Sequence, residues 1–124
     1  MPKILVVEDD HLSRKTVRLF LSEEGYDVYQ TSDGAEALNV LQTTSFDLVL
    51  ADIMMPRVDG VELLMQIRRL APETAVVLMT GYYAGDGEMI GADGFIAKPF
   101  LFKDLLYKIK QVLERRRNAN PQIN

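Results

Sequence analysis

The sequence DLVLAD, residues 47–52, decides how this chain folds, because it is an apolar run with an acid directly behind it. Continuous apolar runs are typical of strands that are covered on both faces, as in the interior of a parallel sheet. Three more apolar runs resemble this one, at residues 4–7, 75–79 and 95–97. A fifth segment, residues 28–31, is weaker and more polar, as expected of an edge strand.

Helical patterns separate these strands, with apolar residues recurring three or four positions apart. Asp10 and Asp33 are suitable caps for the first two helices, and Glu36 gives the second a capping-box pattern. The last helix has the clearest period. The four patterns run from Asp10 to Gly25, from Asp33 to Leu41, from Gly60 to Pro72 and from Phe102 to Leu113.

Strand and helix therefore alternate along the chain, which predicts an α/β domain with a parallel sheet. We expect the flavodoxin-like, doubly wound arrangement of five strands in the order 2-1-3-4-5, because right-handed crossovers exclude most alternatives. A length of 124 residues suits one domain. We place this domain at residues 1–117 and interpret residues 118–124 as a polar tail or the beginning of a linker.

Composition and charge argue against several classes of function. The formal net charge is -4, whereas phosphate contacts need a basic surface, so no direct binding to nucleic acid is expected. The apolar run at the start is too short for a signal peptide or a membrane span, so no membrane contact is expected either. The chain has no cysteine, which excludes disulfides and fits a reducing compartment such as the cytoplasm.

Acidic residues follow the first and third strands. Glu8 and Asp9 come after the first strand, and Asp52 ends the third, so the proposed strand order makes them neighbours. Carboxylates this close destabilise one another unless one takes a proton or a cation joins them. An all-oxygen cluster suits a hard divalent ion, Mg²⁺ or Mn²⁺, with retained waters. We interpret Asp10 as a helix cap rather than a ligand.

A hydroxyl and an ammonium follow the other two strands. Strand 4 leads to Thr80 and strand 5 to Lys98, where Pro99 restricts the backbone to an extended geometry. Together with the acids, this set matches phosphoryl transfer to a carboxylate. The metal and Lys98 would neutralise the phosphoryl oxygens, Thr80 would donate a hydrogen bond, and one aspartate would be the nucleophile.

Several of these motifs resemble one family, the receiver domain of two-component response regulators in the CheY-like superfamily. They are VVEDD at residues 6–10, DIMMPRVDG at 52–60, the strand ending in Thr80, and GFIAKPF at 94–100. The resemblance covers residues 3–117. It implies that Asp52 is the phosphoacceptor.

The resemblance also implies roles for the surrounding residues. Asp9 would be a direct metal ligand and Glu8 a second acid acting through water. Asp52 and the backbone carbonyl of Met54 would complete the protein ligands. Thr80 and Lys98 would contact the phosphoryl group.

Further positions are implied to be structural or to switch. Pro56 and Gly60 would shape the loop after the phosphoacceptor, and the peptide bond between Lys98 and Pro99 would be cis. Phe95 lies where the family usually has a switchable aromatic residue, which moves into the space that the threonine at the end of strand 4 leaves. The other interpretation of Phe95 is a plain core or surface aromatic residue.

The implied function is a two-state switch. A histidine kinase or a histidine phosphotransfer protein would supply the phosphoryl group from phosphohistidine. Phosphorylation would shift the population of pre-existing states and change partner affinity at the face formed by helix 4, strand 5 and helix 5. The partner would be a downstream protein or an attached output domain of a longer chain, and a phosphorylation-dependent dimer is one form that the output could take.

Such a domain is a switch rather than an enzyme, because it catalyses only its own phosphorylation and dephosphorylation. Met54 and Tyr82 flank the path of an attacking water in this family. Both side chains are bulky and position water poorly, so we predict slow self-dephosphorylation.

TGYYAGDGEMIGADGF, residues 80–95, contains five of the chain's eight glycines where the pattern calls for helix 4. A helix that returns along a strand needs about 11 residues, and each interior glycine costs it about 1 kcal/mol. We expect a short helix around residues 87–90 or a loop that phosphorylation orders. Thr80-Gly81-Tyr82 also resembles the FAT GUY subgroup of receivers, which lacks an ordered helix 4, although the rest of that motif is absent.

Two other functions share part of this pattern. A Mg²⁺-dependent phosphatase of the haloacid dehalogenase type also phosphorylates an aspartate, but it typically needs a second aspartate where this chain has Met54. A pseudo-receiver scaffold would keep the fold without being phosphorylated. Incubation with Mg²⁺ and acetyl phosphate separates the scaffold from the switch.

Overall fold

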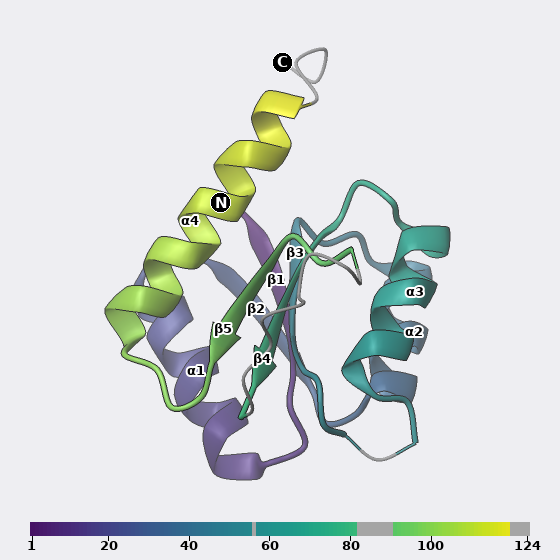
Figure 1. Cartoon of the computed structure of the whole chain (residues 1–124), viewed down its shortest axis with the longest axis horizontal. Helices are drawn as coiled ribbons and strands as arrows, with labels where there is room; N and C mark the ends of the chain where they lie inside the picture. Colours follow the sequence, from purple (N-terminus) through teal and green to yellow (C-terminus); the bar gives the residue numbers. More distant parts are fainter. Residues whose placement is uncertain (56, 82–90, 120–124) are drawn as a thin grey trace.

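The computed structural model describes residues 1–55, 57–81 and 91–119, and it contains a parallel five-stranded sheet (Figure 1). The strand order is β2-β1-β3-β4-β5, so the predicted flavodoxin-like topology is confirmed. The strands are β1 (Lys3–Val7), β2 (Asp27–Thr31), β3 (Leu48–Asp52), β4 (Ala75–Thr80) and β5 (Gly94–Ala97).

Helices cover both faces of the sheet, two on each face in the described part of the chain (Figure 1). One core lies between the sheet and the pair α1 and α4, where Leu21 and Ile109 are buried. The other lies under α2 and α3, where Ala37 and Ile67 are buried. The helices are α1 (His11–Glu23), α2 (Gly34–Thr43), α3 (Gly60–Leu70) and α4 (Phe102–Ala119).

Three of the apolar runs of the sequence form the interior strands β1, β3 and β4, and the fourth forms the edge strand β5. Every residue of β3 and β4 is buried, because alternate side chains enter the two cores on opposite faces of the sheet. Leu48 and Leu50 enter the core under α1 and α4, whereas Val49 and Ala51 enter the core under α2 and α3. The more polar β2 lies at an edge and is mostly exposed, as its sequence predicted.

Aspartates cap the first three helices. The side chain of Asp10 accepts a hydrogen bond from the backbone N–H of Ser13 at 2.8 Å, which confirms its predicted role as a cap. Asp33 accepts from the N–H of Glu36 in the same way. The Glu36 carboxylate accepts from the N–H of Ser32, one residue before the cap, so the predicted capping box is displaced by one position.

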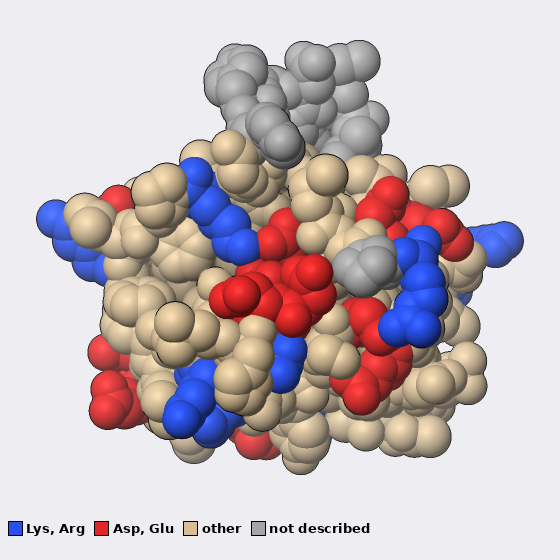
Figure 2. All heavy atoms as spheres, turned by 90° about the horizontal axis from the view of Figure 1, so that it is seen from below, with Lys and Arg blue, Asp and Glu red and all other residues tan. Residues whose placement is uncertain are grey.

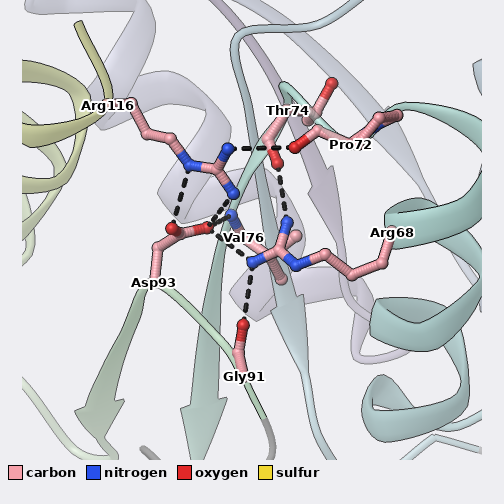
Figure 3. A network of polar contacts seen from close by, with 7 residues as sticks. All are labelled: Arg68, Pro72, Thr74, Val76, Gly91, Asp93 and Arg116. Atoms are coloured by element: carbon pink, nitrogen blue, oxygen red, sulfur yellow. Dashed lines mark hydrogen bonds and ion pairs between the residues drawn. The ribbon is translucent and has the colours of Figure 1, made fainter. Parts of the chain in front are cut away.

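A polar network joins α3, α4 and the amino ends of β4 and β5 (Figure 3). The carboxylate of Asp93 accepts hydrogen bonds from Arg116 at 2.9 and 3.0 Å, from Arg68 at 2.8 Å and from the N–H of Val76 at 2.8 Å. Arg68 also donates to the carbonyl of Gly91 at 2.9 Å. Burial alone would raise the pKa of Asp93, but these hydrogen bonds outweigh it and lower that pKa.

The network also bears on where the last helix ends. The last apolar residue of its pattern is Leu113 and the predicted domain ends at residue 117, whereas α4 continues two residues further, to Ala119. Arg116 binds Asp93 and donates to the carbonyl of Pro72 at 2.9 Å. These contacts hold the last turns of α4 on the domain although their sequence is polar.

Several of the sequence predictions concern residues outside the described ranges. The predicted short helix 4 and its ordering on phosphorylation concern residues 82–90, and the roles of Pro56 and Tyr82 concern undescribed positions. Residues 120–124 of the predicted tail are also outside. Within the described part of the chain, no helix is long and apolar enough to span a membrane.

Candidate functional site

The carboxyl ends of the strands form one face of the molecule, and acidic side chains gather at its centre (Figure 2). There, carboxylate oxygens of Glu8, Asp9 and Asp52 lie within 4.8 Å of one another. Glu8 and Asp52 are buried, with 1% and 7% of their surface exposed, whereas Asp9 is exposed. The structure therefore brings the three acids together and leaves one side of the group open to solvent.

The register of the sheet explains this convergence. Val7, the last residue of β1, pairs with Ala51, so the residues that follow each of them, Glu8 and Asp52, come side by side. The donor atoms are all carboxylate oxygens, the ligands that Mg²⁺ and Mn²⁺ prefer. An ion that keeps several waters also needs an open side, which the exposed Asp9 provides. The residues present thus fit the predicted metal.

Lys98 places its ammonium group among these acids. Its Nζ lies 2.6 Å from Oε1 of Glu8 and 2.5 Å from Oδ2 of Asp52. Burial alone would lower the pKa of Lys98, but the hydrogen bonds to Asp52 and Glu8 outweigh it and raise that pKa. Burial raises the pKa of Glu8, and the hydrogen bond from Lys98 offsets only part of this. The site therefore contains an ammonium that remains charged and a carboxyl group that is protonated more readily than usual.

Both carboxylate oxygens of Asp52 are held in place. Oδ2 accepts from Lys98, and Oδ1 accepts from the backbone N–H of Met54 at 2.9 Å. The Met54 side chain is 60% exposed, so it lies at the open side of the site. Behind Asp52 the loop closes tightly, because a Cβ at Gly60 would lie 2.6 Å from the Asp52 carbonyl oxygen. Glycine is required at this close approach, in agreement with the structural role predicted for position 60.

Thr80 ends β4 and Lys98 directly follows β5, so both residues lie at the carboxyl end of the sheet. Thr80 is the last residue of β4 and is buried, and its carbonyl accepts a hydrogen bond from the N–H of Lys98 at 2.6 Å. The peptide bond between Lys98 and Pro99 is cis, as the family resemblance implies. Phe95 pairs with Leu78 across β4 and β5 and is half-buried against the core under α2 and α3.

Two side chains that support this site were not predicted from the sequence. Arg14, in the first turns of α1, donates from Nη1 to the carbonyl oxygen of Glu8 at 2.9 Å. Its position one turn after the cap Asp10 is the only local signal that it could reach back toward the strand. Arg57 donates to the carboxylate of Asp33, 24 residues away, and no local pattern predicts such a distant pair.

Comparisons with known proteins agree on one family. Residues 4–110 match the model of the response regulator receiver domain. Response regulator MprA of Mycobacterium sp. (strain KMS) is 36% identical over 117 residues, which cover 91% of this chain and 51% of that relative. The chain thus spans about half the length of the curated relatives it matches.

Solved structures give the same result. A CheY-like receiver domain protein from Methanospirillum hungatei is 32% identical and matches with a TM-score of 0.89, covering 96% of this chain and 98% of that one. Response regulator protein TrrA of Thermotoga maritima, solved in complex with Mg(2+)-BeF, is 33% identical and matches with a TM-score of 0.83, covering 90% and 99%. On the combined evidence of sequence, fold and strand-end residues, this chain belongs to the response regulator receiver domain family.

Proposed function

We propose that this chain is a phosphoacceptor switch, in which Asp52 takes a phosphoryl group from the phosphohistidine of a histidine kinase or a histidine phosphotransfer protein. One observation carries the proposal. The Nζ of Lys98 lies 2.5 Å from Asp52, inside a cluster of three carboxylates that fits a divalent ion. Asp52 is therefore a nucleophile surrounded by the cations and donors that a transferring phosphoryl group requires.

The transfer step follows from this arrangement. A carboxylate oxygen of Asp52 attacks the phosphorus atom, and the bond from phosphorus to the histidine nitrogen breaks. The electron pair of that bond stays on the nitrogen, and the imidazole takes up a proton. Lys98 and the hydroxyl of Thr80 then donate hydrogen bonds to the phosphoryl oxygens of the acyl phosphate.

A metal ion would be held beside the nucleophile. The carboxylates of Glu8, Asp9 and Asp52 and the backbone carbonyl of Met54 would bind it, with Glu8 acting through water. When bound, Mg²⁺ or Mn²⁺ supplies the positive charge that neutralises the phosphoryl oxygens during transfer. The structure of the relative TrrA, solved in complex with Mg(2+)-BeF, supports this assignment by analogy.

The output would be a change in partner binding. Phosphorylation of Asp52 redirects the ammonium of Lys98 from Glu8 and Asp52 toward the new oxygens. Thr80 would follow, and Phe95, half-buried near the edge of the sheet, would move into the space that Thr80 leaves. The face formed by the segment between β4 and β5, by β5 and by α4, which is the fifth helix of the prediction, would then present its altered surface to a downstream protein, to a second copy, or to an output domain in a chain as long as the curated relatives.

The chemistry can be tested without knowing the kinase. The chain is incubated in Mg²⁺ and acetyl phosphate, and its intact mass is measured with and without chelator. We expect a gain of one phosphoryl group in the wild type and in Asp27→Asn, which removes an exposed carboxylate at the amino end of β2, the end opposite to the site. Asp52→Asn should gain none.

Each rival function predicts a different result. A pseudo-receiver scaffold would show no change of mass that depends on Asp52, and this outcome would refute the proposal. A phosphatase of the haloacid dehalogenase type would release inorganic phosphate from a phosphate monoester over many turnovers.

The lack of cysteine fits a reducing compartment, so we place the phosphoryl transfer in the cytoplasm.

A further inference from the structure

The loop between β3 and α3, described at residues 53–55 and 57–59, rests on the first turn of α2. Two contacts join them. Nη2 of Arg57 donates to Oδ2 of Asp33 at 2.8 Å. The backbone of Gly34 also lies so close to Val58 that a Cβ at position 34 would be 2.6 Å from the Val58 carbonyl oxygen and 2.7 Å from its Cγ1. The loop and the helix are therefore packed without room for one additional methyl group.

The carboxylate of Asp33 both caps α2 and binds the loop. Its Oδ1 caps α2 by accepting from the N–H of Glu36 at 2.8 Å, while Oδ2 accepts from Arg57. The Asp33 side chain is only 17% exposed, and α2 is anchored in the core by Ala37 and Leu41. Because Asp33 is fixed in this way, it offers Arg57 an immobile partner, although the Arg57 side chain is itself 73% exposed.

The backbone of the loop also needs support. Arg57 has a φ of 67°, the left-handed region that residues other than glycine seldom adopt, and no other non-glycine residue in the described ranges has a positive φ. Such conformations persist only where the surrounding structure holds them. At the base of the loop, the N–H of Gly60 donates to the carbonyl of Ile53 at 2.9 Å. The loop is therefore closed at its base and held at its outer side by α2.

We propose that the first turn of α2 positions this loop for metal binding, with Asp33, Gly34 and Arg57 as positioning residues. This inference rests on the proposed function, because the loop carries the Met54 carbonyl that would be a metal ligand. Mg²⁺ requires near-ideal octahedral geometry, so a carbonyl that is free to shift binds it less tightly. Loosening the contacts with α2 should therefore weaken Mg²⁺ binding while leaving the carboxylates unchanged.

The test is a titration with Mg²⁺ alone, monitored by the amide NMR signals of the wild type, of four single variants and of one double variant. Gly34→Ala inserts the methyl group that has no room, and we expect its dissociation constant for Mg²⁺ to rise about tenfold or more. Gly94→Ala is the matched control. It places a Cβ 3.1 Å from the side chain of Val112, at the amino end of β5 and away from the site, so its Mg²⁺ affinity should stay at the wild-type value.

The ion pair supplies a second test that does not strain the fold. Arg57→Gln removes the charge, and Asp33→Asn keeps a capping oxygen while losing the acceptor for Arg57. Each should weaken Mg²⁺ binding about threefold, because the pair is partly exposed. Since both changes break the same contact, the double variant should lose no more than either single variant. Thermal unfolding of each variant shows whether its stability has changed independently of binding.

Specific results would overturn the inference. It is wrong if Gly34→Ala binds Mg²⁺ as tightly as the wild type, or if Gly94→Ala loses as much affinity. If Gly34→Ala does not fold, wild-type affinity or additive losses in the Asp33 and Arg57 variants would overturn it instead. A wild type that binds Mg²⁺ but is not phosphorylated at Asp52 would refute the proposed function alone and leave this positioning role standing.

Discussion

At the scale of single residues, Lys98 neutralises the charge of two neighbouring carboxylates at the carboxyl end of the sheet. Its ammonium contacts both Glu8 and Asp52, and Glu8 is almost completely shielded from solvent. Two acids in such surroundings repel one another unless a cation lies between them. Lys98 therefore stabilises the fold as well as serving the proposed transfer.

Replacing this cation should destabilise the protein in a way that depends on pH. For Lys98→Gln we expect a loss of about 2–3 kcal/mol in the free energy of unfolding near pH 7, since one partner of a mostly buried pair is removed. Burial already raises the pKa of Glu8 in the folded protein. The ionised form of such a carboxyl group destabilises the folded state, so this cost is present above the raised pKa and disappears as the pH falls below it. The deficit should therefore shrink as the pH falls toward 5, and Mg²⁺ should reduce it at pH 7. Urea unfolding at both pH values measures this, and a deficit that does not change with pH would contradict it.

We predict that the lifetime of the phosphorylated form depends on two other residues. The family resemblance implies that Met54 and Tyr82 flank the path of the attacking water. Both side chains are bulky and position water poorly, so the wild type should dephosphorylate slowly. Met54→Asn combined with Tyr82→Glu should speed the decay about tenfold or more, because a positioned polar group assists the attack. Phosphate release after removal of acetyl phosphate gives the rate, and equal rates for the two proteins would disprove the idea.

Single positions also show what the sequence could predict about the site. Glu8, Asp52, Thr80 and Lys98 could be located because each follows an apolar strand, and parallel strands bring their carboxyl ends to one edge. The pair Arg57 and Asp33 could not be predicted. It depends on how a loop packs on a helix, which neither periodicity nor capping rules describe.

At the scale of elements, the β3–α3 loop is shaped by a glycine with no room for a side chain. Gly60→Ala would place its Cβ 2.6 Å from the Asp52 carbonyl oxygen and 2.7 Å from the Cα of Ile53. Both are backbone atoms that cannot move away without distorting the loop, so we expect a loss of about 1–3 kcal/mol in the free energy of unfolding together with slower phosphorylation. Gly81→Ala is the control, because nothing lies within 4 Å of its Cβ. Thermal unfolding compares the two, and equal stabilities would be inconsistent with the packing described.

The network around Asp93 joins four elements at the opposite end of the sheet (Figure 3). Asp93→Asn removes the charge that lies between Arg68 and Arg116, and we expect a loss of about 1–2 kcal/mol near pH 7, since these groups are 20–29% exposed. The pKa of Asp93 is lowered in the fold, so its contribution is present above the usual aspartate value of about 4 and is lost as the pH falls through the lowered pKa.

Unfolding measurements at pH 7 and pH 3 test this expectation. The two proteins should differ at pH 7 and approach one another at the lower pH. A gap that widens on acidification would show that the charge of Asp93 is not what stabilises the network. Glu114→Gln, an exposed carboxylate change on α4, is a suitable control and should have little effect at either pH.

The elements themselves were largely predictable, with one instructive difference at their ends. The strands and the first three helices lie where the apolar patterns and caps place them, because burial and capping are local properties of the sequence. The apolar pattern of the last helix reaches Leu113 and the domain was predicted to end at residue 117, whereas α4 ends at Ala119. Its last turns are held by Arg116, whose partners Asp93 and Pro72 come from distant parts of the chain.

At the scale of the whole molecule, the two ends of the sheet have different functions. The carboxyl end carries the acids and Lys98 and has open access to solvent (Figure 2). The amino end carries the Asp93 network, which holds the last helix on the domain. This separation would let the proposed phosphoryl transfer proceed at one end while the scaffold at the other end remains in place.

The proposed function requires that Asp52 is the residue that accepts the phosphoryl group. To test this, the acyl phosphate is trapped after incubation with Mg²⁺ and acetyl phosphate by reduction with borohydride, and the modified residue is located by peptide mass spectrometry. We expect modification at Asp52 that disappears when Mg²⁺ is chelated. Modification at Glu8 or Asp9 instead, or none at Asp52 in a folded protein that binds Mg²⁺, would contradict it.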